Sequence, residues 1–196
     1  MKTALKKIAL ACFLISISGI ATAQFQVKPL PVQAVLKQGE ENQFLDGPST
    51  LKLKDYFVWG GSVVKGKDGK YHMLFALWES GADKEQFNKS WVLESKIGHA
   101  ISDYPDRDFE FQKIILRGAR YGNVDAWDAQ GVHNPHVKEF DGSFYLYYIG
   151  GKDPGEQIAP DVDKRNRVQQ SQQLGVIKFD SFEDLEAGKF SRPTEP

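Results

Sequence analysis

The chain has 196 residues, of which 41% are hydrophobic and 12% aromatic, and its 25 basic residues are almost balanced by 26 acidic ones. This composition is typical of a globular protein and excludes a largely disordered chain. The basic residues form no cluster, which argues against nucleic acid as a partner. The length predicts a single domain.

The N-terminus has the pattern of an export signal. Lysines precede an apolar run over residues 8–20, and Ala21-Thr22-Ala23 follows as a small-x-small cleavage motif. The run is shorter than the roughly 20 apolar residues of a membrane span. We therefore predict a signal peptide over residues 1–23, cleaved near Ala23, and a secreted or periplasmic protein without membrane contact after cleavage. The only cysteine, Cys12, lies inside this segment, so no disulfide is expected.

Residues 24–54 are polar and contain several prolines without clear periodicity, which predicts an extended arm or linker. Short strands follow. Two β-runs within 56–79 flank Asp68-Gly69, a hairpin signal, and the segments 95–103 and 109–116 give a third and a fourth strand. The segment 79–94 is expected to be a long loop.

The same order then recurs. "HNPHVKEFDGSFYLYYIG" (133–150) again gives a strand, an Asp-Gly turn and an aromatic strand, and "QLGVIKFDS" (173–181) matches the earlier third strand. An offset of about 74 residues aligns Gly60 with Asn134, and Gly98 falls on Gly175. A repeated four-strand unit predicts an all-β fold, a partial β-propeller with one blade over about 55–120 and a second, incomplete one over about 127–196.

Two further observations bear on this fold. The second strands, "YHMLFALW" and "FYLYYIGG", are apolar on both faces, as in strands sandwiched between neighbouring blades. A β-sandwich also explains the strands but does not predict the repeat. Two blades cannot close a ring, so we expect the missing blades in the same longer chain, the alternative being that another chain supplies them.

The motifs "VWGGSVVKGKDGKYHMLFALWE", "IGHAISDYPDRDFEF" and "HNPHVKEFDGSFYLYYIG" resemble those of the five-bladed β-propeller glycosidases. The resemblance is to glycoside hydrolase family 43 and its relatives in families 32, 117 and 130, and it covers about residues 55–180. It implies hydrolysis of O-glycosidic bonds without a cofactor, through two carboxylic groups that flank the bond. At two positions where the family carries Asp on an inner strand, this chain has Gly60 and Asn134.

The candidate catalytic residues are therefore Asp128 and His133. Asp128 is a carboxylate close to the position that Asn134 occupies, and the alternative for it is a turn-forming role. An imidazole such as that of His133 can donate a proton near neutral pH. No group of residues has the spacing of a metal site, so no metal is expected.

The candidate substrate-binding residues are Trp59, Trp127, Asn134 and Arg167. Indole rings at a funnel mouth can stack on sugar rings, although core packing is the alternative for both tryptophans. Asn134 can hydrogen-bond a sugar hydroxyl, or can simply start a strand before Pro135. Arg167 lies in the polar loop 150–173, which is either a solvated insertion or a lid where arginine binds acidic sugar groups.

Four further aromatic and histidine residues are expected to serve packing. Trp78 and Trp91 are predicted to pack in or beside the loop 79–94, and His72 and His99 to be satisfied core residues. Three functions remain open: an exported glycoside hydrolase that acts on a plant or algal polysaccharide or oligosaccharide, a non-catalytic carbohydrate-binding propeller, and a structural interaction protein.

Overall fold

The computed structural model describes residues 35–36, 45–46, 48–80 and 86–196. The predicted signal peptide and most of the predicted arm lie outside the described residues. Export and the domain boundaries therefore stay predictions. Within the arm, β1 (Val35–Leu36) pairs antiparallel with β2 (Leu45–Asp46). Among the described helices, none is long and apolar enough to cross a membrane.

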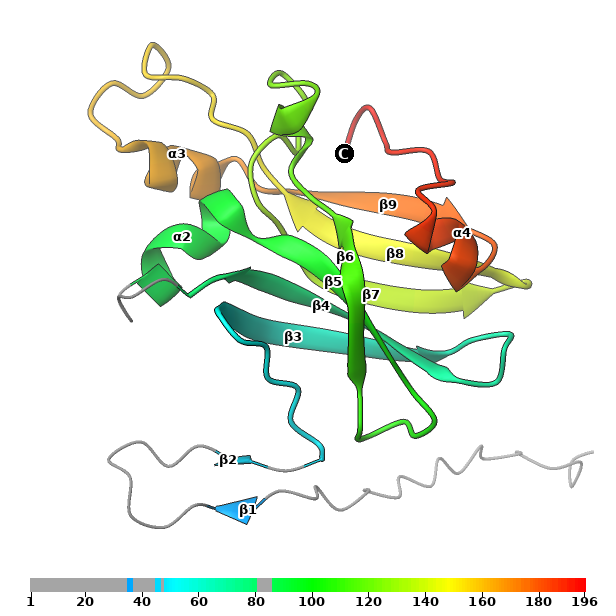
Figure 1. The fold of residues 1–196 in the computed structure, drawn as a ribbon. Coiled ribbons are helices and arrows are strands. Elements are labelled where there is room, and N and C mark those ends of the chain that lie inside the picture. The colour runs from blue at the N-terminus through cyan, green and yellow to red at the C-terminus, as the bar shows by residue number, and fades with distance from the viewer. Residues whose placement is uncertain (1–34, 37–44, 47, 81–85) are drawn as a thin grey trace, which may run out of the picture. The chain divides into compact units, whose positions relative to one another are not determined.

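The first sheet has four antiparallel strands that follow one another in chain order (Figure 1). They are β3 (Tyr56–Lys65), β4 (Tyr71–Glu79), β5 (Lys96–Ser102) and β6 (Glu110–Leu116). The predicted hairpin turn lies between the first two, where Gly69 has a φ of +85° and the Lys70 amide donates to Asp68 Oδ1 at 3.1 Å. The sheet confirms the first predicted four-stranded unit.

The second sheet has three antiparallel strands, again in chain order: β7 (Val132–Phe140), β8 (Ser143–Gly150) and β9 (Gln173–Phe179). The second predicted hairpin turn is present, with positive φ angles at both Asp141 and Gly142. After β9 the described chain contains the short helix α4 (Phe182–Glu186) and irregular structure, so this unit has no fourth strand. This confirms the prediction of an incomplete second unit.

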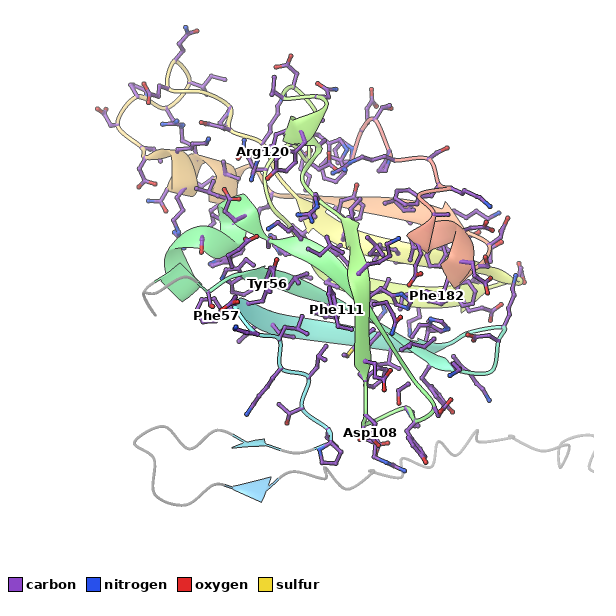
Figure 2. The ribbon with its side chains drawn as sticks, in the orientation of Figure 1. Tyr56, Phe57, Asp108, Phe111, Arg120 and Phe182 are labelled. Carbon is purple, nitrogen blue, oxygen red and sulfur yellow. The ribbon has the colours of Figure 1, made fainter. Side chains whose placement is uncertain are left out.

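Two segments predicted as plain loops contain helices. The segment 79–94 includes α2 (Gln86–Glu94), and the segment 150–173 includes α3 (Lys164–Gln170). Tertiary contacts hold α2, because the Arg120 guanidinium donates to Leu93 O and to Glu94 Oε2, both at 2.6 Å. Arg120 belongs to the 3-10 turn η1 (Ala119–Tyr121) and is labelled in Figure 2. The helix α3 is capped by Asp163, whose carboxylate accepts from the Asn166 amide at 3.0 Å.

The main core lies between the two sheets, where β7 packs against β3 and β4 (Figure 1). Buried apolar side chains from both sheets and from α4 fill it, among them Leu74, Ile97, Leu146, Tyr148, Ile177 and Leu185. The strand β4 is buried on both faces, as predicted, because residues 51 and 53 cover the other side of the first sheet. Among the described residues, the outer face of the second sheet is uncovered, and it exposes Tyr147 and, on β9, Leu174 and Val176, as expected where a neighbouring blade is missing.

The predicted repeat is visible in the backbone of the two inner strands. The register of β3 shifts between Trp59 and Gly61, and that of β7 shifts between His133 and His136. The residues inside the two bulges, Gly60 and Asn134, have φ angles of +52° and +50°. Glycine and asparagine are the residues that enter this left-handed region most readily, which explains why they occupy the two bulges. These are the two positions that the 74-residue offset aligned.

The aligned third-strand glycines also have equivalent surroundings. Gly98 on β5 pairs with Phe75 on β4, and Gly175 on β9 pairs with Tyr148 on β8. A Cβ atom at Gly98 would lie 2.7 Å from the Phe75 ring, and one at Gly175 would lie 2.5 Å from the Trp127 ring. Both glycines are therefore required because an aromatic ring lies directly on the backbone.

Candidate functional site

A hollow of about 260 Å³ lies beside the two bulges, and we call it the tryptophan pocket. It is lined by Trp59, Ala76, Trp78, Trp91, His133, Asn134 and Gln172. These residues come from β3, β4, α2, β7 and the turn between α3 and β9. The volume is near the lower end of ligand sites, about 300 Å³. Among the described residues, the lining contains no aspartate, glutamate, lysine or arginine.

Three indole rings shape the tryptophan pocket. The Trp59 side chain is 56% exposed, whereas Trp78 is buried, and Trp91 packs edge-on against the His133 ring with centroids 5.0 Å apart. Ala76 lies directly across from Trp59 in the β3–β4 pairing, and its small side chain leaves the space beside the ring open. The faces of aromatic rings suit the C–H faces of sugars, and indole N–H groups can bind their oxygens.

His133 lines the tryptophan pocket and is only 4% exposed. Burial lowers the pKa of its imidazole to about 4, although a hydrogen bond with the Asn134 side chain opposes the shift. The ring is therefore neutral at pH 7 and offers one donor and one acceptor. An imidazole with a pKa of about 4 is scarcely protonated at neutral pH, so this pKa does not favour the predicted role of His133 as a general acid.

Asn134 occupies the bulge of β7, and its side chain is exposed at the tryptophan pocket. A bulge turns a side chain away from the regular alternation of the strand. The predicted pocket positions of Trp59, His133 and Asn134 thus agree with the geometry, and their roles toward a ligand stay predictions.

Asp128 does not reach the tryptophan pocket, which corrects its predicted position. Its side chain is fully buried, accepts a 2.7 Å hydrogen bond from the Tyr148 hydroxyl, and pairs with the Arg192 guanidinium at 2.8 Å. Burial and the Asp128 contact both raise the pKa of Tyr148, so the phenol remains a donor. Asp128 therefore fastens the C-terminal segment to β8 and has no open side toward a substrate.

Trp127 is also in the core and not at a funnel mouth. It is 7% exposed, packs against the Tyr148 ring at 5.6 Å, and donates from Nε1 to the carbonyl of Pro193 at 3.1 Å. Gly150 and Gly175 lie against the same ring. The structure thus favours the core-packing alternative for Trp127, because the indole is buried against Tyr148, Gly150 and Gly175.

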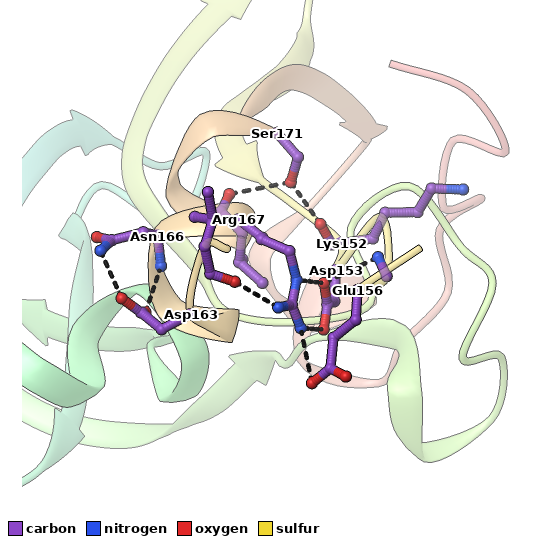
Figure 3. A network of polar contacts seen from close by, with 10 residues as sticks. Lys152, Asp153, Glu156, Asp163, Asn166, Arg167 and Ser171 are labelled. Atoms are coloured by element: carbon purple, nitrogen blue, oxygen red, sulfur yellow. Dashed lines mark hydrogen bonds and ion pairs between the residues drawn. The ribbon is translucent and has the colours of Figure 1, made fainter. Parts of the chain in front are cut away.

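Arg167 has a structural position inside the loop 150–173 (Figure 3). Its guanidinium binds both carboxylate oxygens of Asp153, at 2.7 and 2.9 Å, and donates to the carbonyl of Val162 at 2.5 Å. The contact with Arg167 lowers the pKa of Asp153 to about 2. Since Arg167 is buried and paired, the structure corrects its predicted role as a direct ligand of acidic sugars.

A second hollow lies on the other side of the main core, between β4, β5 and α4, and contains the predicted core histidines. His72 Nδ1 lies 2.8 Å from His99 Nε2. The outer nitrogens contact carboxylates: Asp68 lies 3.1 Å from His72 Nε2, and Glu186 lies 2.6 Å from His99 Nδ1. The Phe182 ring, labelled in Figure 2, stacks on His72 at 3.7 Å. All four ring nitrogens are used, so this histidine chain is a structural element, as predicted for the two histidines.

The sequence matches no protein-family model, and no curated protein is significantly similar to it. Solved structures are similar to parts of the fold. The GH43_1 enzyme from Xanthomonas citri in complex with xylotriose is 15% identical with a TM-score of 0.47, over 76% of this chain and 35% of that one. A family 117 glycoside hydrolase from Zobellia galactanivorans is 14% identical with a TM-score of 0.48, over 82% and 43%.

A third structure, a GH43 β-xylosidase/α-arabinofuranosidase from a compost metagenome, is 15% identical with a TM-score of 0.46, over 83% of this chain and 39% of that one. The chain resembles part of these glycoside hydrolases. It spans less than half the length of each, so any activity of a whole protein is a matter for proposal. The similarity is too distant to transfer residue roles, and the site described above rests on its own geometry.

Four lining residues were missed by the sequence analysis: Ala76, Trp78, Trp91 and Gln172. Trp78 follows Ala76 on the same face of β4, and this period of two was an available signal. Trp91 lies on α2, which Arg120 holds in place from a distant segment. Gln172 lies in the turn between α3 and β9. The contact between Arg120 and α2 has no local sequence signature.

Proposed function

We propose that the tryptophan pocket binds a neutral carbohydrate and that the chain is the substrate-binding part of an exported O-glycosyl hydrolase. The observation that carries the proposal is the lining itself, in which three indole rings surround uncharged polar groups. Sugars combine apolar C–H faces with hydroxyl groups, and such a lining offers partners for both. The similarity in sequence motifs to family 43 enzymes agrees with a plant or algal polysaccharide or oligosaccharide as the substrate.

The lining also bears on the charge of the sugar. A uronate or a sulfate ester would enter the tryptophan pocket without a cationic partner among the described lining residues, and a charge that loses water without gaining a partner is destabilised. The neutral His133 ring cannot supply that partner at pH 7, given its lowered pKa. We therefore expect neutral sugars to bind and acidic ones to be rejected.

One observation favours a second candidate, a carbohydrate-binding propeller without catalysis. Hydrolysis by the usual mechanism needs two carboxylic groups beside the bond, and the described lining supplies none. Under the first candidate, these groups come from residues outside the tryptophan pocket. Under the second, the chain binds a glycan and does not cleave it.

A single set of experiments tests both candidates. Xylotriose, arabinotriose and cellotriose would be titrated into the full chain by calorimetry, with trigalacturonic acid as the acidic comparison. Binding of at least one neutral trisaccharide and not of the acidic one supports carbohydrate binding, and the absence of any binding refutes it. Product analysis after long incubation separates the candidates, because cleavage contradicts the non-catalytic one.

A further inference from the structure

We propose that the outer face of the second sheet binds a second copy of this chain, and that two copies close a ring of four sheets. Tyr147 on β8 lies directly across from Val176 on β9, and both are exposed, as is the nearby Leu174. Apolar side chains gathered on one face mark an interaction surface. This assembly does not depend on the ligand of the tryptophan pocket.

The repeat that relates the two sheets shows what such a face binds. The turn glycines and the third-strand glycines of the two units align, and these alignments place Tyr147 at the position of Leu74 and Leu174 at that of Ile97. Leu74 and Ile97 are fully buried in the main core, where the first sheet packs against the second. The outer face of the second sheet is therefore equivalent to the face with which the first sheet binds the second. A further sheet of the same kind is the partner that fits it.

The complementary surface is the outer face of the first sheet, which has a groove of about 260 Å³. Four apolar residues of β3 and β4 line this groove: Val58, Val63, Met73 and Phe75. Their aligned counterparts in the second unit all belong to the main core: Val132, Val137, Leu146 and Tyr148. The first sheet thus presents the same kind of face that the second sheet uses to pack against it, and Val63 on this face is exposed.

Leu51 and Leu53 pack on part of the outer face of the first sheet and do not oppose this contact. The 74-residue offset aligns Leu53 with Trp127, so each precedes the inner strand of its unit. Trp127 packs against Gly175 and belongs to the main core, and the second sheet still packs on the first one. The segment before the inner strand is therefore part of the packing face in both units.

The number of faces points to a second copy as the partner. Each copy offers one face of each kind, so two copies related by a twofold axis satisfy both. The second sheet of each copy then covers the first sheet of the other. Four sheets lie within the range of roughly 4–8 blades in closed propellers, and twofold dimers are the commonest closed assemblies.

The first test is the mass of the purified full chain in solution, measured by sedimentation equilibrium at micromolar concentration. We expect twice the mass of one chain. Leu174→Lys puts a charge into the contact and should raise the dissociation constant at least about a hundredfold, since a buried charge without a partner is costly. Ile158→Lys is the matched control, because this exposed side chain lies in the loop 150–173 and on neither sheet. Circular dichroism checks that both variants fold.

A mixing experiment tests which faces meet. Val63→Lys alters the outer face of the first sheet and should also give a monomer. A mixture of Leu174→Lys and Val63→Lys allows one intact contact, between the unaltered second sheet of one copy and the unaltered first sheet of the other. The mixture should therefore recover part of the association that each variant alone has lost.

Several outcomes contradict this assembly. A monomeric wild-type chain would leave the outer face of the second sheet to a further sheet of a longer chain, as expected from the sequence. An assembly larger than a dimer would show that two copies do not close a ring. A dimer that survives in Leu174→Lys would arise from contacts elsewhere in the chain. A mixture that stays monomeric would refute the pairing of the two outer faces.

Discussion

The two buried histidine sites of this molecule have opposite environments. In the histidine chain, His72 and His99 use every ring nitrogen in contacts with each other and with Asp68 and Glu186. In the tryptophan pocket, His133 has no carboxylate partner among the described residues, and burial lowers its pKa to about 4. The comparison teaches that a buried histidine indicates a ligand site only where its hydrogen-bonding capacity remains open beside a hollow.

Among the predicted effects, the largest are losses of stability on removing a histidine, and the loss should be greater in the histidine chain than in the tryptophan pocket. His99→Ala leaves His72 and Glu186 without their shared partner in a buried position, and we expect a loss of about 3 kcal/mol or more. His133→Ala removes mainly packing against Trp91 and should cost about 1–2 kcal/mol. Unfolding by urea at pH 7 measures both values. Equal losses would contradict the distinction between the two sites.

The stability of the wild-type protein should depend on His133 between pH 6.5 and pH 4. Because its pKa is lowered in the folded state, the unfolded chain binds the proton first as the pH falls. The contribution of the neutral ring is fully present above the ordinary pKa of about 6.5 and is lost down to about pH 4, at most about 3 kcal/mol.

The variant His133→Gln keeps a polar side chain that does not titrate. Its free energy of unfolding, followed by urea titration across the same pH range, should be flatter than that of the wild type. An unchanged pH dependence would place the responsible group elsewhere, for example in the histidine chain.

The exposed ring of the tryptophan pocket should affect binding and not stability. Trp59→Ala should weaken the binding of a neutral trisaccharide by about tenfold, because stacking contacts of aromatic rings contribute roughly 0.5–1.5 kcal/mol. The melting temperature should stay close to that of the wild type. Phe140→Ala is a suitable control, because this ring is similarly exposed, at 65%, and does not line the pocket. Equal binding by both variants would remove Trp59 from the site.

The smallest expected difference is spectroscopic. In the histidine chain, both rings are buried and each ring nitrogen lies within hydrogen-bond distance of a partner. Burial lowers the pKa of His99, despite the raising effect of its hydrogen bond with Glu186. Nitrogen-15 NMR of the imidazoles should show slowly exchanging protons on His72 and His99, and fast exchange on both would contradict the complete chain.

Much of the fold was predictable from the sequence, because the repeat has local causes. Asp-Gly turns, strands of period two and the glycines beneath aromatic rings all have sequence signatures, and the bulge positions Gly60 and Asn134 aligned correctly. The helices α2 and α3 were not predicted. Arg120, from a distant segment, stabilises α2, and the single capping residue Asp163 stabilises α3. The apolar pattern of β8 does not itself show whether another sheet covers its outer face, which is exposed at Tyr147.

The candidate site was predictable only in part. Trp59, His133 and Asn134 were found because the repeat places them at the bulges. Asp128, Trp127 and Arg167 were expected at a ligand, but all three are buried and contact Arg192, Tyr148 and Asp153 inside the protein. These partners lie 14 to 64 residues away along the chain. A residue's closeness in sequence to the repeated strand motifs therefore did not predict whether its side chain is accessible to a ligand.

The most direct measurement of the central claim uses the four tryptophans of the chain as reporters. Their indole N–H signals would be followed by NMR while xylotriose, arabinotriose or cellotriose is added. Binding in the tryptophan pocket predicts that the signals of Trp59, Trp78 and Trp91 move together. The signal of Trp127, whose Nε1 group donates a hydrogen bond to the Pro193 carbonyl in the core, should stay in place. Movement of Trp127 without the other three, or no movement with any of the three sugars, would contradict carbohydrate binding at this site.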